Sequence, residues 1–289
     1  MKKAKLPLSP AKKRQRRINI LCYFLVIIPL VFISLPLVTT LSSSFKYGVD
    51  MFVDKGLIPK NPTVENYQYI VFNYDFFGYF KNSLIISGIA TFGCVMIGSL
   101  AGYGISRFRG GAFSLFKLMT YVLQMIPMGL VIVPMYIVIR SLGLYDTQLS
   151  VMVLYIGLNL CLCIWIMKGF FDTIPYDIEE SAFMDGCGQY RSFLRIVMPL
   201  AGPGIACCSI LTFMGTYNEL ALASLFLKNT AIQPITLGMQ NFAQQFTNAE
   251  TWGYIYAGSV LTTLPAVLVV FFAQKYIIAG LSGAGSLKG

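Results

Sequence analysis

The hydrophobic residues of this chain gather in six long blocks that are separated by polar and charged segments. Each block is 19 to 24 residues long, and a helix needs ~20 residues to cross the ~30 Å hydrocarbon core of a bilayer. The blocks cover residues 18–41, 83–104, 118–139, 149–167, 200–222 and 253–273. This pattern predicts an all-α integral membrane protein with six transmembrane helices.

The first block resembles a signal peptide only in its position. Its apolar stretch of 24 residues exceeds the apolar region of roughly 7 to 15 residues in a signal peptide, and no A-x-A-like cleavage site follows it. We therefore expect residues 18–41 to remain in the mature protein as a span.

The composition supports membrane insertion. The chain of 289 residues is 56% hydrophobic and 12% charged, and its mean hydropathy is +0.68. A soluble domain would carry roughly 25% charged residues.

Lys and Arg are distributed unequally between alternate loops, which predicts the orientation because these residues concentrate on the cytoplasmic side. If the basic N-terminus (residues 1–17) is cytoplasmic, 16 of the 22 Lys and Arg residues lie on that side. We therefore expect both termini, including the tail at 274–289, to be cytoplasmic. The basic run at 12–17 directly precedes a span, so anionic lipid accounts for it and nucleic-acid binding is not expected.

The seven cysteines lie in or beside the hydrophobic blocks, and the chain has no His. Neither a disulfide framework nor a zinc site fits this placement. We therefore expect no bound metal, and small apolar packing residues at all seven positions.

The loop at 168–199 has the pattern of a helix-turn-helix. Thr173 is suited to cap a helix start, Pro175 suits a first turn, and three carboxylates follow that favour the positive end of a helix. Gly186 and Gly188 permit a sharp turn after about Asp185. A second short helix is expected from Gln189 to Val197, ending before Pro199.

This loop resembles the EAA loop of binding-protein-dependent ABC importer permeases. Their pattern is E-A-A, three residues, G, nine residues, I-x-L-P. The matching positions here are Glu180, Ser181, Ala182, Gly186, Ile196 and Pro199, with Ser181 and Met198 as conservative departures. The spacing is complete, which makes the match far more specific than the bare triplet.

The resemblance implies that the loop is the cytoplasmic coupling element, which docks on a separate ATPase. Ile178 and Ala182 would share one helix face, and Glu179, Glu180 and Asp185 would offer carboxylates to basic partners. The chain has no G-x-x-x-x-G-K-[ST] motif. We expect no cofactor on this chain, ATP and Mg on the partner ATPase, and no catalytic residue here.

Three further stretches resemble the maltose-type, carbohydrate branch of that family. They are Asn82-Ser83-Leu84, Tyr217-Asn218-Glu219 where the branch usually has W-N-E, and the tail from Gly280 to Gly289. The resemblance implies a pore subunit in a bacterial cell membrane for a carbohydrate such as an oligosaccharide. Its partners would be a second permease subunit in a heterodimer, two ATPase subunits and an extracytoplasmic solute-binding protein.

Polar residues within the blocks are candidates for the translocation pathway, because such residues tend to face a cavity or another helix. They are Gln124, Tyr155, Asn159, Tyr217, Asn218 and Glu219. An interhelical hydrogen bond explains each one equally well. Gly98 and Gly102 form a G-x-x-x-G pattern that favours helix packing, and the amide-rich loop at 229–250 is a candidate contact for the binding protein.

Two other classes of function remain as alternatives. A secondary transporter commonly carries acidic residues at mid-membrane, but the only carboxylate in any block is Glu219, near one end. A membrane enzyme would need a cluster of catalytic side chains, and the chain has neither His nor clustered acids in its blocks.

Overall fold

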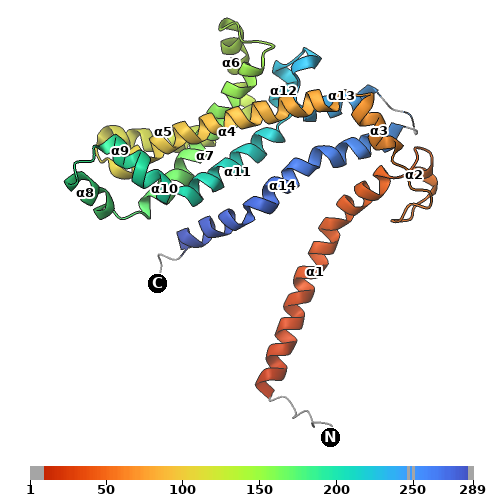
Figure 1. The fold of residues 1–289 in the computed structure, drawn as a ribbon, viewed down its shortest axis with the longest axis horizontal. Coiled ribbons are helices and arrows are strands. Elements are labelled where there is room, and N and C mark those ends of the chain that lie inside the picture. The colour runs from red at the N-terminus through yellow and green to blue at the C-terminus, as the bar shows by residue number, and fades with distance from the viewer. Residues whose placement is uncertain (1–9, 246–247, 249–250, 286–289) are drawn as a thin grey trace. The chain divides into compact units, whose positions relative to one another are not determined.

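The computed structural model describes residues 10–245, 248 and 251–285, and all regular structure in these residues is helical. Part of the basic N-terminus (1–9), part of the amide-rich loop (246–247 and 249–250) and the last four residues lie outside the described part. The chain divides into two compact units, Met1–Ile70 with Phe246–Val260, and Val71–Gln245 with Leu261–Gly289. Figure 1 shows the helices of each unit.

The first unit holds α1 (Pro10–Ser44), α2 (Asp50–Val53), most of α3 (Glu65–Phe72) and the start of α14 (Trp252–Gly285). The buried Asn66 ties the end of α1 to α3, because its amide donates to the carbonyls of Ser44 and Lys46, both at 2.8 Å. Gly253 packs against the Asn66 side chain, where a Cβ would lie 2.6 Å from Oδ1. These contacts order the segment between α1 and α3.

A carboxylate holds the turn after α2. Asp54 accepts hydrogen bonds from the backbone N–H groups of Gly56 and Lys60, each at 3.2 Å. The bond from Gly56 and then that from Lys60 lower the pKa of Asp54, because both favour the charged form. Lys46 closes the turn by donating to the carbonyls of Asp54 and Gly56.

The second unit is built on three long helices, α4 (Phe76–Arg107), α7 (Gln148–Asp172) and α11 (Gly202–Tyr217). α4 packs most extensively against α7. The glycines allow this approach, since a Cβ on Gly98 would meet Cys163 Sγ at 2.5 Å and one on Gly102 would meet the Ile164 carbonyl oxygen at 3.0 Å. The predicted packing role of the G-x-x-x-G pattern is therefore confirmed.

The block predicted as one transmembrane helix over 118–139 is broken in the structure. The chain forms α5 (Gly111–Met125) and α6 (Met128–Ser141), which meet at 104°. Pro127 causes the break: it has no N–H for the helix ladder, and it restricts the residue before it to extended backbone. Ile126 adopts that conformation, with φ −75° and ψ 119°.

The prediction of one helix over 200–222 is also wrong at its end. α11 ends at Tyr217, and a separate short helix, α12 (Ala221–Phe226), follows. The 3-10 turn η2 (Thr230–Ile232) and α13 (Ile235–Gln245) complete this part of the chain. Before α11, the helical run Gln189–Leu200 meets it at 76°.

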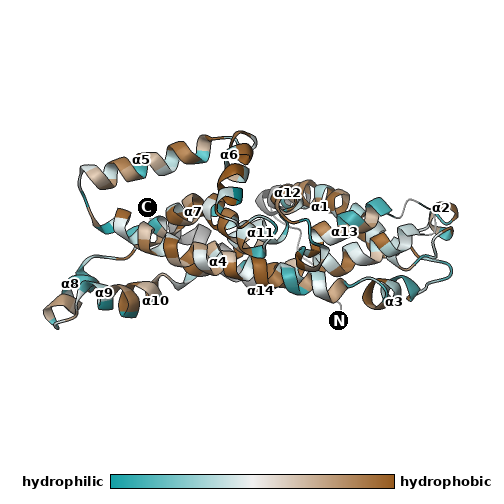
Figure 2. Ribbon diagram, turned by 90° about the horizontal axis from the view of Figure 1, so that it is seen from above, coloured by the Kyte–Doolittle hydropathy of each residue, from teal (hydrophilic) through white to brown (hydrophobic). Residues whose placement is uncertain are grey.

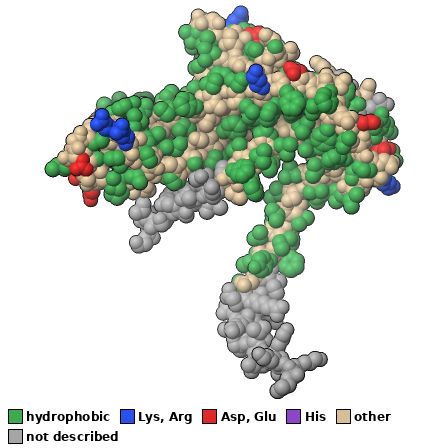
Figure 3. All heavy atoms as spheres, in the orientation of Figure 1, with side chains coloured by type: hydrophobic (Ala, Val, Ile, Leu, Met, Phe, Trp, Pro, Cys, Tyr) green, Lys and Arg blue, Asp and Glu red, His purple; other side chains and the backbone are tan. Residues whose placement is uncertain are grey.

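In the part of the chain that the structure describes, four helices are long and apolar enough to cross a membrane, and up to six spans result if each bent pair counts as one. The four apolar stretches are Leu21–Ser44, Phe76–Arg107, Gln148–Asp172 and Trp252–Phe272. Large hydrophobic side chains are exposed along them, for example Phe32 at 76% and Phe92 at 69%. Figure 2 shows apolar residues along these helices, and Figure 3 shows that hydrophobic side chains dominate the visible face. Exposure of this kind suits lipid as the surrounding solvent.

The expectation that all cysteines serve only as packing residues is wrong for two of them. Cys163 of α7 and Cys208 of α11 form a disulfide, with Cα atoms 5.7 Å apart, inside the core between the two helices. Hydropathy and spacing could not predict this pair, because the two residues lie 45 positions apart.

Candidate functional site

The loop predicted as a helix-turn-helix forms a finger, which we define as residues 173–200. It contains α8 (Asp177–Met184), α9 (Gln189–Ser192), the π-turn η1 (Phe193–Val197) and α10 (Met198–Leu200). Residues 168–172 belong to α7 instead, and Thr173 ends that helix rather than capping α8, since its hydroxyl donates to the Phe170 carbonyl. The second helical run continues through Pro199 rather than stopping before it, because Pro is tolerated in the first turn of α10.

The tip of the finger is a Schellman turn. The Cys187 N–H donates to the Ala182 carbonyl at 2.9 Å, and the Gly186 N–H donates to the Phe183 carbonyl at 3.0 Å. Gly186 has φ +77°, as this turn requires, whereas Gly188 has φ −67°. The predicted sharp turn therefore depends on Gly186 and not on Gly188.

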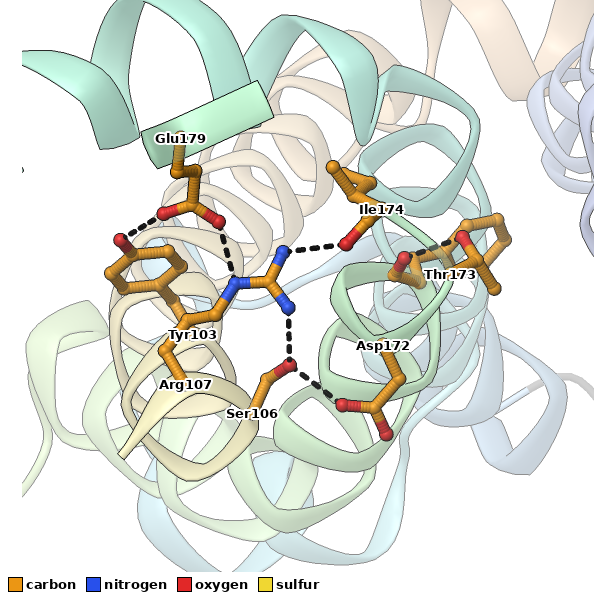
Figure 4. A network of polar contacts seen from close by, with 8 residues as sticks. Tyr103, Ser106, Arg107, Asp172, Thr173, Ile174 and Glu179 are labelled. Atoms are coloured by element: carbon orange, nitrogen blue, oxygen red, sulfur yellow. Dashed lines mark hydrogen bonds and ion pairs between the residues drawn. The ribbon is translucent and has the colours of Figure 1, made fainter. Parts of the chain in front are cut away.

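Glu179 anchors the finger to the end of α4 (Figure 4). Its side chain is fully buried and accepts a hydrogen bond from the Tyr103 hydroxyl at 2.6 Å and one from Arg107 Nε at 2.5 Å. Arg107 also donates to the Ile174 carbonyl at 2.9 Å. Since Arg107 is itself 9% exposed, this is a desolvated ion pair whose remaining polar atoms are largely satisfied.

Aromatic side chains pack around this ion pair. The Tyr103 ring lies 4.7 Å from the Phe193 ring and 5.8 Å from the Phe171 ring. These rings bring together the end of α4, the end of α7 and the second arm of the finger, and all three side chains are buried. The finger is thus held at its base by both packing and charge.

The exposed face of the finger offers carboxylates beside apolar groups. Glu180, Ser181 and Asp185 are exposed, and so are Met184 at 88% and Tyr190 at 72%. Among the other predicted coupling residues, Ala182 is buried, Ile196 is partly buried and Pro199 is exposed. Only two of the three carboxylates that we expected to face a basic partner are therefore available, because Glu179 is used within the chain.

Sequence reasoning missed Tyr103 and Arg107 as partners of this site. Arg107 contributed only to the count of positive loop charges, and Tyr103 only to the length of a block. One signal was present: Glu179 and Ala182 are three residues apart on α8, so a helix that buries Ala182 brings Glu179 toward the same face.

Two of the pathway candidates form a structural contact in the interior of the second unit. The buried Tyr155 donates its hydroxyl to Glu219 at 2.7 Å. The Glu219 carboxylate also accepts from the backbone N–H groups of Leu222 and Ala223, at 2.9 and 3.2 Å. Glu219 therefore caps the start of α12.

The other four pathway candidates divide by exposure. Tyr217 is buried and donates its hydroxyl to the Thr262 carbonyl at 3.0 Å. Asn159 is partly buried and donates to the Tyr155 carbonyl at 2.9 Å. Gln124 and Asn218 are exposed, although the Asn218 amide donates to the Met214 carbonyl.

The amide-rich segment, which we define as residues 229–245, is fixed to the start of α4. The Asn82 amide donates to the carbonyls of Ala231 and Gln233, at 2.9 and 3.0 Å, and its oxygen accepts from Gln148. The Ile235 N–H donates to the buried Ser83 hydroxyl at 2.7 Å. The outer amides Gln244 and Gln245 remain exposed at the end of α13.

Tyrosines add to this attachment. The Tyr74 hydroxyl donates to the Gly238 carbonyl at 2.5 Å, and Tyr79 covers Gly238 so closely that a Cβ there would lie 2.7 Å from its ring. Burial raises the pKa of Tyr74 well above its usual value, so the phenol stays a proton donor.

Known proteins are similar to this chain in sequence or in fold. The permease protein YcjP of Escherichia coli (strain K12), described as an inner membrane ABC transporter permease, is 32% identical over 258 residues, which cover 88% of this chain and 91% of that protein. The trehalose/maltose transport system permease MalG of Thermococcus litoralis is 31% identical over 82% of this chain and 86% of that protein. A bacterial ABC transporter for alginate import contains a chain with the same fold, with a TM-score of 0.81 at 19% identity over 94% of this chain and 99% of that chain.

The family model gives the assignment. The family model described as "Binding-protein-dependent transport system inner membrane component" matches residues 94–283, which include the finger and the amide-rich segment. The resemblance carried by the EAA-like pattern is thereby confirmed. The chain belongs to this family of ABC transporter permeases and is a multi-pass component of an inner membrane.

Proposed function

We propose that this chain is the pore subunit of an ATP-driven importer that takes up a carbohydrate, most simply an oligosaccharide. The family supports import with a binding protein, and permeases for trehalose, maltose and maltodextrin are among the relatives at 30 to 31% identity. The single observation that carries the proposal is the finger, which is anchored rigidly at its base and presents exposed carboxylates and apolar side chains at its tip.

The proposed orientation follows from the distribution of Lys and Arg, 16 of 22 on one side. It makes both termini and the finger cytoplasmic and the amide-rich segment extracytoplasmic. Six spans result when α5 with α6 is one span and α11, preceded by the bend, is another. We propose a basic N-terminus at 1–17, a permease domain at 18–273 and a tail at 274–289, with a coupling element that starts after Asp172.

The proposed complex contains a second permease subunit, two ATPase subunits and an extracytoplasmic solute-binding protein. ATP and Mg are bound by the ATPase subunits, since this chain has no phosphate-binding loop. Glu180, Ser181, Asp185 and Gly186 form the coupling contact. Gln124 and Asn218, the exposed polar candidates in the blocks, are the better choices for contact with the solute.

Co-purification in a mild detergent tests the proposal. A tag on this chain should retain an ATPase and a second permease, and the reconstituted complex should take up sugar only when ATP and the binding protein are supplied. The purified chain alone should hydrolyse no ATP. ATP hydrolysis by the isolated chain, or uptake driven by an ion gradient without ATP, would contradict the proposal.

A further inference from the structure

α4 carries a fixed attachment at each of its ends. Near its start, Asn82 and Ser83 hold the amide-rich segment, and in its last turn Arg107 holds the finger through Glu179. Asn82 and Arg107 are 25 residues apart, which is about 38 Å along a helix that rises roughly 1.5 Å per residue. This one helix is therefore long enough to reach from one membrane face to the other, across a core of ~30 Å.

The helix between the two attachments has the features of a rigid element. α4 contains no internal Pro, whereas α1, α6 and α14 each contain at least one. Its middle is locked against α7 by the close approach of Gly98 to Cys163 and of Gly102 to Ile164. Between Asn82 and Arg107, α4 is therefore one uninterrupted helix that is packed against α7 through Gly98 and Gly102.

The attachment at the start of α4 is specific to the Asn82 side chain. Its amide nitrogen donates to two backbone carbonyls, and its oxygen accepts from Gln148 Nε2 at 2.9 Å. Since carbonyl oxygens only accept, the orientation of this amide is fixed by its partners. No single smaller side chain satisfies all three contacts.

The attachment at the end of α4 is equally specific. The Arg107 guanidinium uses one nitrogen for Glu179 and another for the Ile174 carbonyl. Arg107 therefore binds the finger at two points, the Ile174 carbonyl before α8 and the Glu179 side chain within α8. A Lys, with a single charged nitrogen, would not reproduce both contacts.

We propose that Asn82 and Arg107 are positioning residues that make α4 a rigid link between the amide-rich segment and the finger. A protein that engages the segment on one face then shifts the finger on the other. This inference rests on the proposed function, in which the solute-binding protein engages the segment and the ATPase engages the finger. It assigns the coupling between the amide-rich segment and the finger to α4 and to the side chains of Asn82 and Arg107.

The experiment uses the complete complex, reconstituted with its ATPase and its solute-binding protein. The readout is the ratio of ATP hydrolysis with the loaded binding protein to basal hydrolysis without it. We expect Asn82→Ala and Arg107→Gln each to lower this ratio at least fivefold. In Asn82→Ala, whose contacts lie away from the finger, basal hydrolysis and the amount of bound ATPase should stay within twofold. Lys81→Gln and Arg109→Gln, exposed neighbours of the two residues, are the controls and should change nothing.

The double variant gives the decisive comparison. If both residues act in series through α4, Asn82→Ala with Arg107→Gln lowers the ratio no further than the worse single variant, whereas independent damage at two distant sites would multiply. Glu179→Gln keeps the shape of the buried pair and provides a second variant should Arg107→Gln insert poorly; it should lower the same ratio. Multiplied effects, or an unchanged ratio in Asn82→Ala, would overturn the link. Absence of any ATPase from the wild-type complex would instead refute the proposed function.

Discussion

Replacement of Gly186 by Ala should weaken docking of the ATPase on the finger. A residue with a Cβ in the left-handed region costs roughly 1–2 kcal/mol, and Gly186 has φ +77°. A Cβ at Gly186 would meet nothing within 4 Å, so the cost is conformational and not steric. The tip is exposed and held by two local hydrogen bonds, hence little opposes its relaxation to another turn.

The expected size follows from that cost. If the docking-competent turn loses 1–2 kcal/mol relative to its alternatives, the ratio of this turn to the alternatives falls by roughly 5- to 30-fold, and the apparent Kd for the ATPase rises by up to the same factor. Gly186→Asn should lie between wild type and Ala, because Asn tolerates this conformation better than Ala does. Gly188→Ala is the matched control, since Gly188 has φ −67° and also has open space around it.

Titration of the purified permease complex with its ATPase, read as ATPase retained and as sugar uptake, measures the effect. The order of apparent affinity should be wild type with Gly188→Ala, then Gly186→Asn, then Gly186→Ala. Equal affinity for Gly186→Ala and Gly188→Ala would refute the reasoning, because only the backbone conformation distinguishes the two positions.

Further outcomes are expected at other places in the chain. In a variant without the exposed Cys22 and the partly exposed Cys161 and Cys187, Tyr190→Cys should react with a membrane-impermeant thiol reagent only from the cytoplasm and Asn61→Cys only from outside; the reverse would overturn the orientation. Exchange of the exposed Gln244 and Gln245 for Ala should lower uptake with the complex still assembled, and unchanged uptake would make the segment a passive connector. Because the folded-state pKa of Asp54 is lowered, the stability that its carboxylate gives the turn is present above the ordinary Asp pKa and is lost as the pH falls through the folded value. Amide exchange of this turn should therefore speed up in acid, and Asp54→Asn should remove that acid dependence; an unaltered dependence in Asp54→Asn would assign it to another group.

The helical, membrane-embedded character was predictable because hydropathy over ~20 residues needs no tertiary information. The positions at which the predicted helices break were not predictable. The average hydropathy of a block does not register the single Pro127 that separates α5 from α6. The end of α11 depends on Glu219, whose side chain caps the next helix. The turn at Gly186 was predictable because φ > 0 favours glycine locally.

The separate roles of Glu179 and Glu180 were not predictable from their sequence. The two carboxylates are neighbours with the same chemistry, and only the packing of α8 on α4 buries one and exposes the other. The contact of Tyr155 with Glu219, 64 positions apart, likewise arises from the tertiary fold. Sequence patterns therefore located the finger but could not say which of its charges face inward.

The buried pair of Glu179 and Arg107 also limits how this permease can be rebuilt. The finger looks like a separable module that could be grafted from a relative to change the ATPase it accepts. Glu179 of the finger, however, is paired with Arg107, which lies 72 positions earlier in the chain. A graft bounded by residues 173–200 would therefore place the incoming Glu179 carboxylate beside the α4 end of a different protein. A working chimera must carry the last turns of α4, with Tyr103 and Arg107, together with the finger.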